Sequence, residues 1–462
     1  MRVLNFAIIA FCLSFVACKK STSFCSIKEF GAIGDYKTNN TLAIQSAIDA
    51  CHKSGGGEVL VEGGDYVTGT ILLKDNVTLK IEENASLIGS ENPEDYRNID
   101  SFVDATGQVR GKCLIGAIDA KNIGLVGTGV IDGRGKIFES KTLREKLMNK
   151  GYEKNTINKL VANRPFLIRF VRSENIKMDG LLLRQSAAWT CHFFQCNAIN
   201  VNRLEIYGHA NKNNDGIDID SSHDVQITNC YINTGDDAIC LKTTSPLPTY
   251  NVKVSDCTLK SEWGAIKLGT ESMGDMYNID IRRCKVNYTK GGGIKILSVD
   301  GANITDVTID SINMTNVDMP IFIRLGERLR TYRDAPKREV GSINNVNILN
   351  ITGSSADLDG SRVSPPAGVF ITGTPNYKVG KINLKNIYIT LPGGGLAEHK
   401  NINVIEDETK YPEFSLFGIL PSYGLMARHV EDLNLENYKF IITRPDERHD
   451  ILTLDVDNFN KK

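Results

Sequence analysis

Two short acidic phrases contain the residues with the clearest capacity for chemistry. Residues 213–222 read NNDGIDIDSS, and residues 233–242 read NTGDDAICLK. In each phrase an Asp stands two residues before a pair of apolar residues that suits a strand. If these pairs stack in neighbouring strands, Asp215 and Asp237 fall in one column, about 4.8 Å apart. Asp236 then lies beside both.

Three carboxylates this close cannot all ionise at low cost, because repulsion raises the pKa of at least one. A protonated acid beside ionised neighbours suits glycosidic bond cleavage, in which one carboxyl protonates the leaving oxygen and another activates water. A surface acidic ladder or a calcium site stays open, since carboxylate and Asn oxygens are hard ligands. Strict alternation would point Asp236 and Asp237 to opposite faces, so joint action requires a bend near Gly235.

A recurring phrase predicts the fold that positions these acids. It consists of Asn or Asp, a β-branched residue and then alternating polar and apolar positions, at steps of 24 to 27 residues. Its copies are Asn175-Ile176, Asn200-Val201, Asp224-Val225, Asn251-Val252, Asn278-Ile279 and Asn303-Ile304. No amphipathic helix recurs with them. Short strands without a helix predict an all-β fold, a parallel β-helix in which stacked coils bury one another's apolar faces.

Cysteines share one predicted interior column with aliphatic residues. The column five residues after each repeat apolar contains Leu181, Ile206, Cys230, Cys257, Cys284 and Ile309. We therefore interpret the three cysteines as small buried hydrophobes, although a disulfide between adjacent coils is not sterically excluded.

The ends and one interruption complete the predicted solenoid. Residues 41–51 form an amphipathic segment that predicts a helix capping the first coil, and residues 134–164 form a polar excursion with Leu143, Leu147 and Ile157 as anchors. We expect this excursion to fold over one end of a substrate groove. After about residue 440 the repeat fades into a charged tail. Residues 19–462 are thus predicted to form a single domain.

The first residues and the charge balance restrict location and partners. Residues 1–18 combine Arg2, an apolar run and Cys18, a pattern that predicts an export signal. It resembles a bacterial lipoprotein signal, so we expect an exported protein, periplasmic or anchored in the outer membrane by a lipid on Cys18; plain secretion is the alternative. Lys plus Arg is 54 and Asp plus Glu is 55, so no basic excess indicates nucleic-acid binding.

The paired phrases resemble the hallmark motifs of glycoside hydrolase family 28, the polygalacturonase family. The likeness extends from residues 30–35, FGAIGD, to residues 423–425, YGL. It implies a right-handed parallel β-helix that hydrolyses α-linked galacturonate in pectic chains with inversion. By the same resemblance Asp236 matches the general acid, and Asp215 and Asp237 match the pair that positions water. No cofactor or metal is implied.

Two departures separate this chain from endo-acting members of the family. Those members have Gly-His-Gly one coil after the acids, whereas residues 263–270 read WGAIKLGT and contain no His. The family's Arg-Ile-Lys phrase is replaced around Lys295. In both motifs the chain resembles exo-acting and rhamnogalacturonan-directed members more closely. We therefore expect galacturonan or rhamnogalacturonan fragments as substrate.

Candidate substrate-binding residues lie on the coils next to the acids. Stacking the inward pairs Ile239/Leu241, Ile266/Leu268, Ile294/Ile296 and Ile321/Ile323 predicts an outward cationic row of Lys242, Lys267, Lys295 and Arg324. An ordinary solvated face is the alternative. Trp263, one coil beyond the acids, and His209, six residues before Asp215, are further candidates.

Two other functions are compatible with a pectin-binding β-helix. A calcium-dependent pectate lyase would use a basic residue for β-elimination and form an ultraviolet-absorbing unsaturated uronide. A non-catalytic pectin-binding solenoid would leave no new reducing ends.

Overall fold

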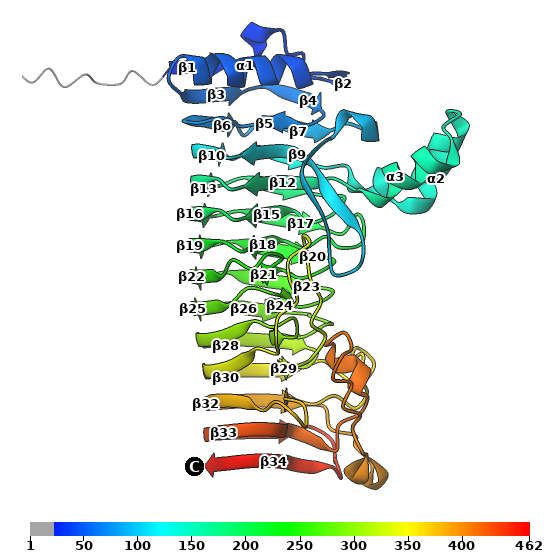
Figure 1. Ribbon diagram of the computed structural model, residues 1–462, viewed down its shortest axis with the longest axis vertical. Helices are drawn as coiled ribbons and strands as arrows, with labels where there is room; N and C mark the ends of the chain where they lie inside the picture. Colours follow the sequence, from blue (N-terminus) through cyan, green and yellow to red (C-terminus); the bar gives the residue numbers. More distant parts are fainter. Residues whose placement is uncertain (1–22) are drawn as a thin grey trace, which may run out of the picture.

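The computed structural model describes residues 23–462 as one stack of β-coils (Figure 1). Strands of successive coils pair in parallel, and one antiparallel pair, β8 (Arg97–Val103) with β9 (Val109–Ile118), stands apart from this pattern. The coils wind right-handed, the hand favoured for crossovers between parallel strands. The predicted parallel β-helix is confirmed. The predicted export signal and Cys18 lie outside the described residues, and no helix within 23–462 is long and apolar enough to cross a membrane.

Three sheets run along the stack. The sheet that positions the acids, called the front sheet here, contains β5 (Ile71–Leu72), β9, β12 (Phe166–Val171), β15 (Cys191–Phe194), β18 (Ile217–Asp220), β21 (Ile239–Thr243), β24 (Ile266–Ser272), β27 (Ile294–Ser298), β29 (Ile321–Leu325) and β31 (Val369–Thr372). The second sheet contains β2 (Asp35–Asn39), β4 (Gly64–Thr68), β7 (Ala85–Gly89), β11 (Val130–Asp132), β14 (Leu182–Arg184), β17 (Glu205–Gly208), β20 (Tyr231–Thr234), β23 (Thr258–Ser261) and β26 (Lys285–Asn287).

The third sheet carries the recurring phrase and merges with the second toward the C-terminus. Its strands are β1 (Ser23–Ser26), β3 (Gly57–Val61), β6 (Val77–Ile81), β10 (Lys121–Gly127), β13 (Glu174–Asp179), β16 (Asn197–Asn202), β19 (His223–Thr228), β22 (Thr249–Ser255) and β25 (Met276–Arg282). Long strands then span more than one sheet. β28 (Asn303–Val317), β30 (Ser342–Ser355) and β32 (Val379–Leu391) serve the second and third sheets, β33 (Ser422–Ile442) reaches all three, and β34 (His449–Lys461) extends the front and third sheets. The predicted charged tail is therefore wrong, because β34 forms one more coil paired with β33.

The inward columns agree with the prediction near the acids and differ elsewhere. Ile217, Ile239, Ile266, Ile294 and Ile321 stack in register as expected. Two copies of the recurring phrase were placed in the wrong register. The residue that pairs with both Ile176 and Val225 is Ile199, not Val201, and Val307 rather than Ile304 pairs with Ile279. Both members of each pair are buried, so the apolar pattern alone does not fix the register.

The column that contains the three cysteines is apolar as predicted, but two of its other members differ from the prediction. Leu204 precedes Cys230 in the column, since the Tyr231 amide donates to the Leu204 carbonyl, and Asn313 donates to Cys284 in the same way. The predicted members Ile206 and Ile309 pair with Ile232 and Ile281 instead. Cys230, Cys257 and Cys284 are buried and free, which confirms them as small apolar residues without a disulfide.

The predicted helices are present at both places. Helix α1 (Thr41–Lys53) buries Ile44, Ala47, Ile48 and Cys51, an i, i+3, i+4, i+7 face, against the first coil. In the excursion, α2 (Ser140–Asn149) and α3 (Lys154–Ala162) bury Leu143, Leu147 and Ile157 as expected. These two helices project from the side of the stack next to β9 and β12 (Figure 1).

Two covering segments pack on the outer face of the front sheet. On the N-terminal side, Phe102 of the β8–β9 hairpin joins an apolar cluster with Phe166, Trp189 and Phe194. On the C-terminal side, segment 402–420, which includes the 3₁₀ turn Phe414–Phe417, packs on Phe322 and Phe370. The coils that carry both acidic phrases lie between these two covers.

Candidate active site

Asp215 and Asp237 occupy equivalent positions in successive coils, as predicted. Each stands two residues before its front-sheet strand, β18 or β21, where the chain enters from the second sheet. The Gly216 amide donates to the Asp237 carbonyl at 2.8 Å, and Ile217 pairs with Ile239. The parallel register therefore places the two carboxylates side by side.

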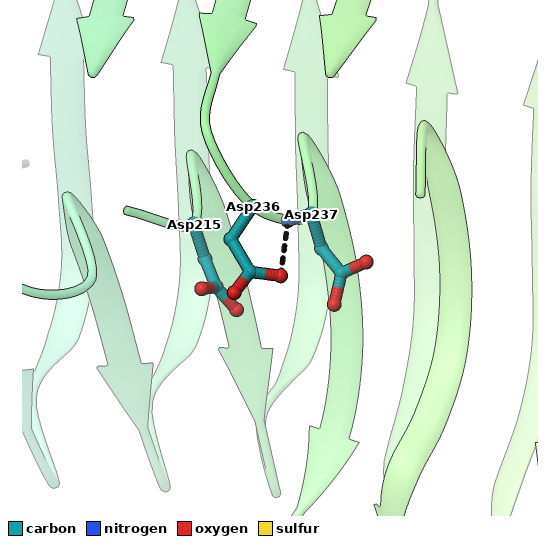
Figure 2. A group of neighbouring side chains, drawn as sticks. All are labelled: Asp215, Asp236 and Asp237. Carbon is teal, nitrogen blue, oxygen red and sulfur yellow. Dashed lines mark hydrogen bonds between the residues drawn. The ribbon is translucent and has the colours of Figure 1, made fainter. Parts of the chain in front are cut away.

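Asp236 joins them because the chain bends between β20 and β21. The predicted break at Gly235 is present, and the Asp236 carboxylate turns back so that Oδ1 accepts the Asp237 backbone N–H at 2.9 Å. Figure 2 shows the three carboxyl groups extending to the same side of the sheet. One oxygen of each lies within 4.8 Å of the others.

This spacing is shorter than the one usual for the acid and the base of an inverting hydrolase. An inverting pair usually has carboxyl groups about 6.5–9.5 Å apart. The bend at Gly235 instead brings Asp236 close to both neighbours, so the spacing alone does not indicate inversion.

Two buried lysines neutralise the acids at the floor of the site. Lys242 Nζ lies 3.0 Å from Asp215 Oδ2 and 3.1 Å from Asp218 Oδ1, and Lys267 Nζ lies 2.6 Å from Asp237 Oδ2. The ammonium of Lys242 also stands 3.7 Å from the centre of the Trp189 ring. The carboxylates are therefore held from below, with their positions fixed by charge pairs and packing.

The surroundings give the three acids different protonation tendencies. Burial raises the pKa of Asp236 well above its ordinary value, and the negative charges of Asp215 and Asp237 raise it further. Burial also raises the pKa of Asp215, although Lys242 opposes it. For Asp237 the burial effect is outweighed by Lys267 and Lys295, which hold its pKa below the ordinary value. The site thus favours a protonated Asp236 beside an ionised Asp237.

Asn213 orients the outer acid. Its Oδ1 accepts hydrogen bonds from Arg110 at 3.2 Å and Arg164 at 2.9 Å, which leaves its amide Nδ2 to donate to Asp236 Oδ2 at 3.4 Å. Arg110 also donates to Asp104 at 2.7 Å. This network links the acid to the β8–β9 hairpin.

The acids line a pocket of about 340 Å³, including its open mouth. Its lining is Asp104, Ala105, Thr106, Trp189, Asn213, Asp215, Asp236, Asp237, Lys242, Lys267, Thr270, Glu271 and Tyr411. The tip of the β8–β9 hairpin closes one side, where the Ala105 amide donates to Glu271 at 3.3 Å, and Tyr411 closes the other, bonded to Thr270 at 3.1 Å. The expected wall was misplaced, because no residue of α2 or α3 lines this pocket.

The remaining predicted site residues lie around the pocket or away from it. Lys295 is fully buried behind Asp237 and pairs with Glu413 at 2.7 Å. Arg324 donates to the carbonyls of Gly373, Glu406 and Asp407 and so holds the C-terminal cover instead of facing the pocket. Trp263 is half-buried and does not line the pocket. His209 bonds Asn233 at 2.8 Å and lines a separate cavity with Tyr207.

Sequence reasoning missed the residues that close the pocket. Asp104, Thr106, Glu271 and Tyr411 come from segments that either leave the repeat or lie at strand ends. No periodic signal marks the hairpin tip or residue 411. The four predicted cations do come from one sheet, but three of them are already paired with carboxylates.

The pocket on this parallel β-helix combines a carboxyl group that favours the protonated form with one that favours the ionised form. This combination is typical of sites that hydrolyse carbohydrates. Residues 59–409 match the glycosyl hydrolases family 28, and the chain belongs to that family. It is 30% identical over 253 residues to the exo-poly-alpha-D-galacturonosidase of Dickeya chrysanthemi, a match covering 46% of this chain and 41% of that protein. The chain thus spans less than half the length of this curated relative.

Two solved structures share the fold. The Yersinia enterocolitica family 28 exopolygalacturonase superposes with a TM-score of 0.71 at 20% identity, covering 96% of this chain and 79% of that chain. The Thermotoga maritima exopolygalacturonase gives a TM-score of 0.67 at 21% identity, covering 80% and 87%. At these identities the likeness concerns the fold.

Proposed function

We propose that the protein is an exported hydrolase that removes terminal galacturonate units from pectic chains with inversion. The observation that carries the proposal is the trio Asp215, Asp236 and Asp237 on the floor of a pocket covered on both sides. The names of the relatives, which are a galacturonosidase and exopolygalacturonases, support galacturonate as the sugar.

Asp236 is the general acid in this proposal. It is the least buried of the three, so it can reach the glycosidic oxygen at the pocket mouth, and its surroundings keep it protonated. Asp237, ionised by Lys267, takes a proton from the attacking water, and Asp215 helps to orient that water. Positioned proton transfer of this kind contributes roughly 10²- to 10⁴-fold to rate.

Inversion follows from where the nucleophilic water would lie. Asp215 and Asp237 are almost fully buried and tied to lysines beneath them, at 3.0 and 2.6 Å. We therefore assign the attack to a water held above these two carboxylates and not to either carboxylate itself. Displacement by that water inverts the anomeric carbon, as the family resemblance implies.

The covers on both sides of the pocket favour exo action. An endo-acting enzyme needs an open groove along which the polymer runs in both directions. Here the β8–β9 hairpin and segment 402–420 occupy the front sheet on either side of the acids. In this proposal a chain end, rather than the middle of a chain, binds between them.

The contacts favour hydrolysis over calcium-dependent elimination. Calcium binds six to eight oxygens at about 2.3–2.6 Å. In this site two lysine ammonium groups already neutralise Asp215 and Asp237. A cation added between these carboxylates would face both positive charges.

Export and lipid attachment rest on residues 1–18 alone. Labelling of expressing cells with a radioactive fatty acid tests the anchor at Cys18. The full-length chain should take up the label, the Cys18→Ala variant should not, and an unlabelled full-length chain in the secreted fraction would contradict the anchor.

Incubation with a panel of pectic oligosaccharides tests the activity itself. The proposal expects new reducing ends without ultraviolet-absorbing products, and the Asp236→Asn variant serves as the control. Absorbing products would indicate a lyase, and binding without new reducing ends would indicate a non-catalytic pectin-binding protein.

A further inference from the structure

The cations at the site do not explain how an acidic leaving group is recognised. Lys242, Lys267 and Lys295 each pair with a carboxylate, and Arg324 is bonded to backbone carbonyls. Among the residues that line the pocket, five are acidic and two are lysines. A uronate that leaves past Asp236 therefore needs a cation from outside this set.

Trp263 occupies the place next to Asp236 in the following coil. The register that pairs Ile239 with Ile266 sets Asp236 and Trp263 at the same position in successive coils, about 4.8 Å apart along the stack. The Ser261 hydroxyl joins them, donating to the Asp236 carbonyl at 2.7 Å and accepting the Trp263 amide at 2.8 Å. Trp263 is therefore held directly beside the proposed acid.

The indole faces the same side of the sheet as the acids. Its ring centre lies 5.6 Å from Lys295 Nζ, and Lys295 acts electrostatically on Asp237. Gly291 in the next coil makes room for the indole, because a Cβ at that position would stand 2.8 Å from the Trp263 backbone and 3.0 Å from Cγ.

Arg362 lies on this ring, and the carboxylate that acts on it electrostatically, Asp318, bonds to the backbone of the same turn. Its guanidinium carbon stands 3.9 Å from the Trp263 ring centre, and the side chain is exposed. Its side-chain hydrogen bond goes to the Glu262 carbonyl at 3.3 Å, and within residues 23–462 it forms no ion pair. Glu262 itself pairs with Lys290.

The backbone that carries Arg362 is fixed from below. Buried Asp318 accepts the Arg362 amide at 2.6 Å and the Ser361 hydroxyl at 2.7 Å. The guanidinium is thus presented on an aromatic surface by an anchored turn. A planar guanidinium held in this way can bind a carboxylate with two parallel hydrogen bonds.

We propose that Arg362, supported by Trp263, binds the carboxylate of the uronate unit on the leaving-group side of the scissile bond. The inference rests on the proposed function, since it assigns the leaving-group side from the role of Asp236. Arg362 is then a specificity-determining residue that selects a uronate over a neutral leaving group.

A pair of substrates that differ in the leaving group tests the assignment. Digalacturonate leaves a uronate, whereas nitrophenyl galacturonide has the same transferred sugar and a neutral leaving group. For Arg362→Gln we expect kcat/KM on digalacturonate to fall at least tenfold, because a charge-assisted hydrogen bond to the leaving uronate is lost. On the nitrophenyl substrate kcat/KM should stay within about twofold. Arg362→Lys should recover part of the loss, because charge remains and the planar fork does not.

A matched variant and a binding measurement complete the test. Arg203→Gln removes an exposed arginine that pairs with Asp179 on the far edge of the stack, and it should leave both substrates unaffected. Calorimetry of digalacturonate with Asp236→Asn, with and without Arg362→Gln, reports binding without turnover. Equal affinities, or equal losses on both substrates, would overturn the assignment of Arg362. Absence of hydrolysis by the wild type alongside an Arg362-dependent affinity would overturn the proposed function instead.

Discussion

Asp236 and Asp237 are consecutive in the chain and joined by a hydrogen bond from the Asp237 amide to Asp236 Oδ1 at 2.9 Å, yet their electrostatic surroundings are opposite. Asp237 rests on the Lys267 ammonium, whereas Asp236 accepts hydrogen bonds from two neutral donors, the Asp237 backbone N–H and the Asn213 amide, and faces two other carboxylates. The bend at Gly235 therefore produces an acid and a base from adjacent residues.

Replacement of the outer acid should remove turnover and preserve the fold. We expect Asp236→Asn to lower kcat by roughly 10²- to 10⁴-fold, because it removes positioned proton donation. Asp215→Asn and Asp237→Asn should also be severe. Initial rates on galacturonate oligomers, with circular dichroism as the control for folding, check this, and a wild-type rate for Asp236→Asn would refute the assigned mechanism.

The pH profile should depend on the lysine beneath Asp237. Activity requires protonated Asp236, so it falls as pH rises through the raised pKa of that group, and it requires ionised Asp237, so it falls as pH drops through the lowered pKa. Lys267→Met removes the principal cation that lowers the pKa of Asp237. The acidic limb of kcat/KM should then move to higher pH, because a neighbouring opposite charge that favours the ionised carboxylate is lost.

Lys295→Met should produce a smaller change in the same pH profile. Lys295 acts on the same carboxylate more weakly than Lys267, so its removal should move the acidic limb in the same direction by less. The exposed Lys121→Met, on the third sheet, should leave the limb in place. An acidic limb that does not move in Lys267→Met would contradict the base role of Asp237.

The first product should have the inverted anomeric configuration. In the proposed mechanism, water held by Asp215 and Asp237 attacks the face opposite the bond that Asp236 protonates. Proton NMR of the product before mutarotation reads the configuration directly. Retention would indicate that one of the closely spaced carboxylates attacks the sugar itself.

The hairpin tip should determine product length. Val103 and Val109 pair across the hairpin, so residues 104–108 can be replaced by a two-residue Asn-Gly turn that keeps the strands in register. Removal of the tip takes away Asp104, Ala105 and Thr106 from the pocket wall. We expect longer oligomers among the products of this variant, measured by chromatography of a galacturonan digest.

A change in the excursion is the control for that variant. Shortening the turn between α2 and α3, residues 150–153, should leave product lengths unchanged because this segment does not line the pocket. If both variants release the same products as the wild type, the hairpin is not the wall.

The periodic part of the molecule was predictable from sequence, and the non-periodic covers were not. Asp215 and Asp237 could be placed in one column because each precedes a stacked apolar pair at a fixed distance. Even the bend at Gly235 followed from the need to bring Asp236 to the same face. Each of these inferences uses neighbours one coil apart.

The pocket walls depend on contacts that no repeat specifies. Ala105 meets Glu271, and Tyr411 meets Thr270, across well over a hundred residues of chain. The hairpin and segment 402–420 are held by apolar side chains on the outer face of the sheet, where alternation predicts only outward exposure. The same covers explain why Arg324, predicted to face substrate, bonds to backbone carbonyls of the C-terminal cover.

Time-resolved product analysis on a long, unesterified galacturonan tests the central claim most directly. The account predicts that galacturonic acid appears from the first samples, that viscosity falls slowly, and that no ultraviolet-absorbing uronide forms; the Asp236→Asn variant should release nothing. A rapid loss of viscosity with mid-length oligomers, or an unsaturated product, would contradict it.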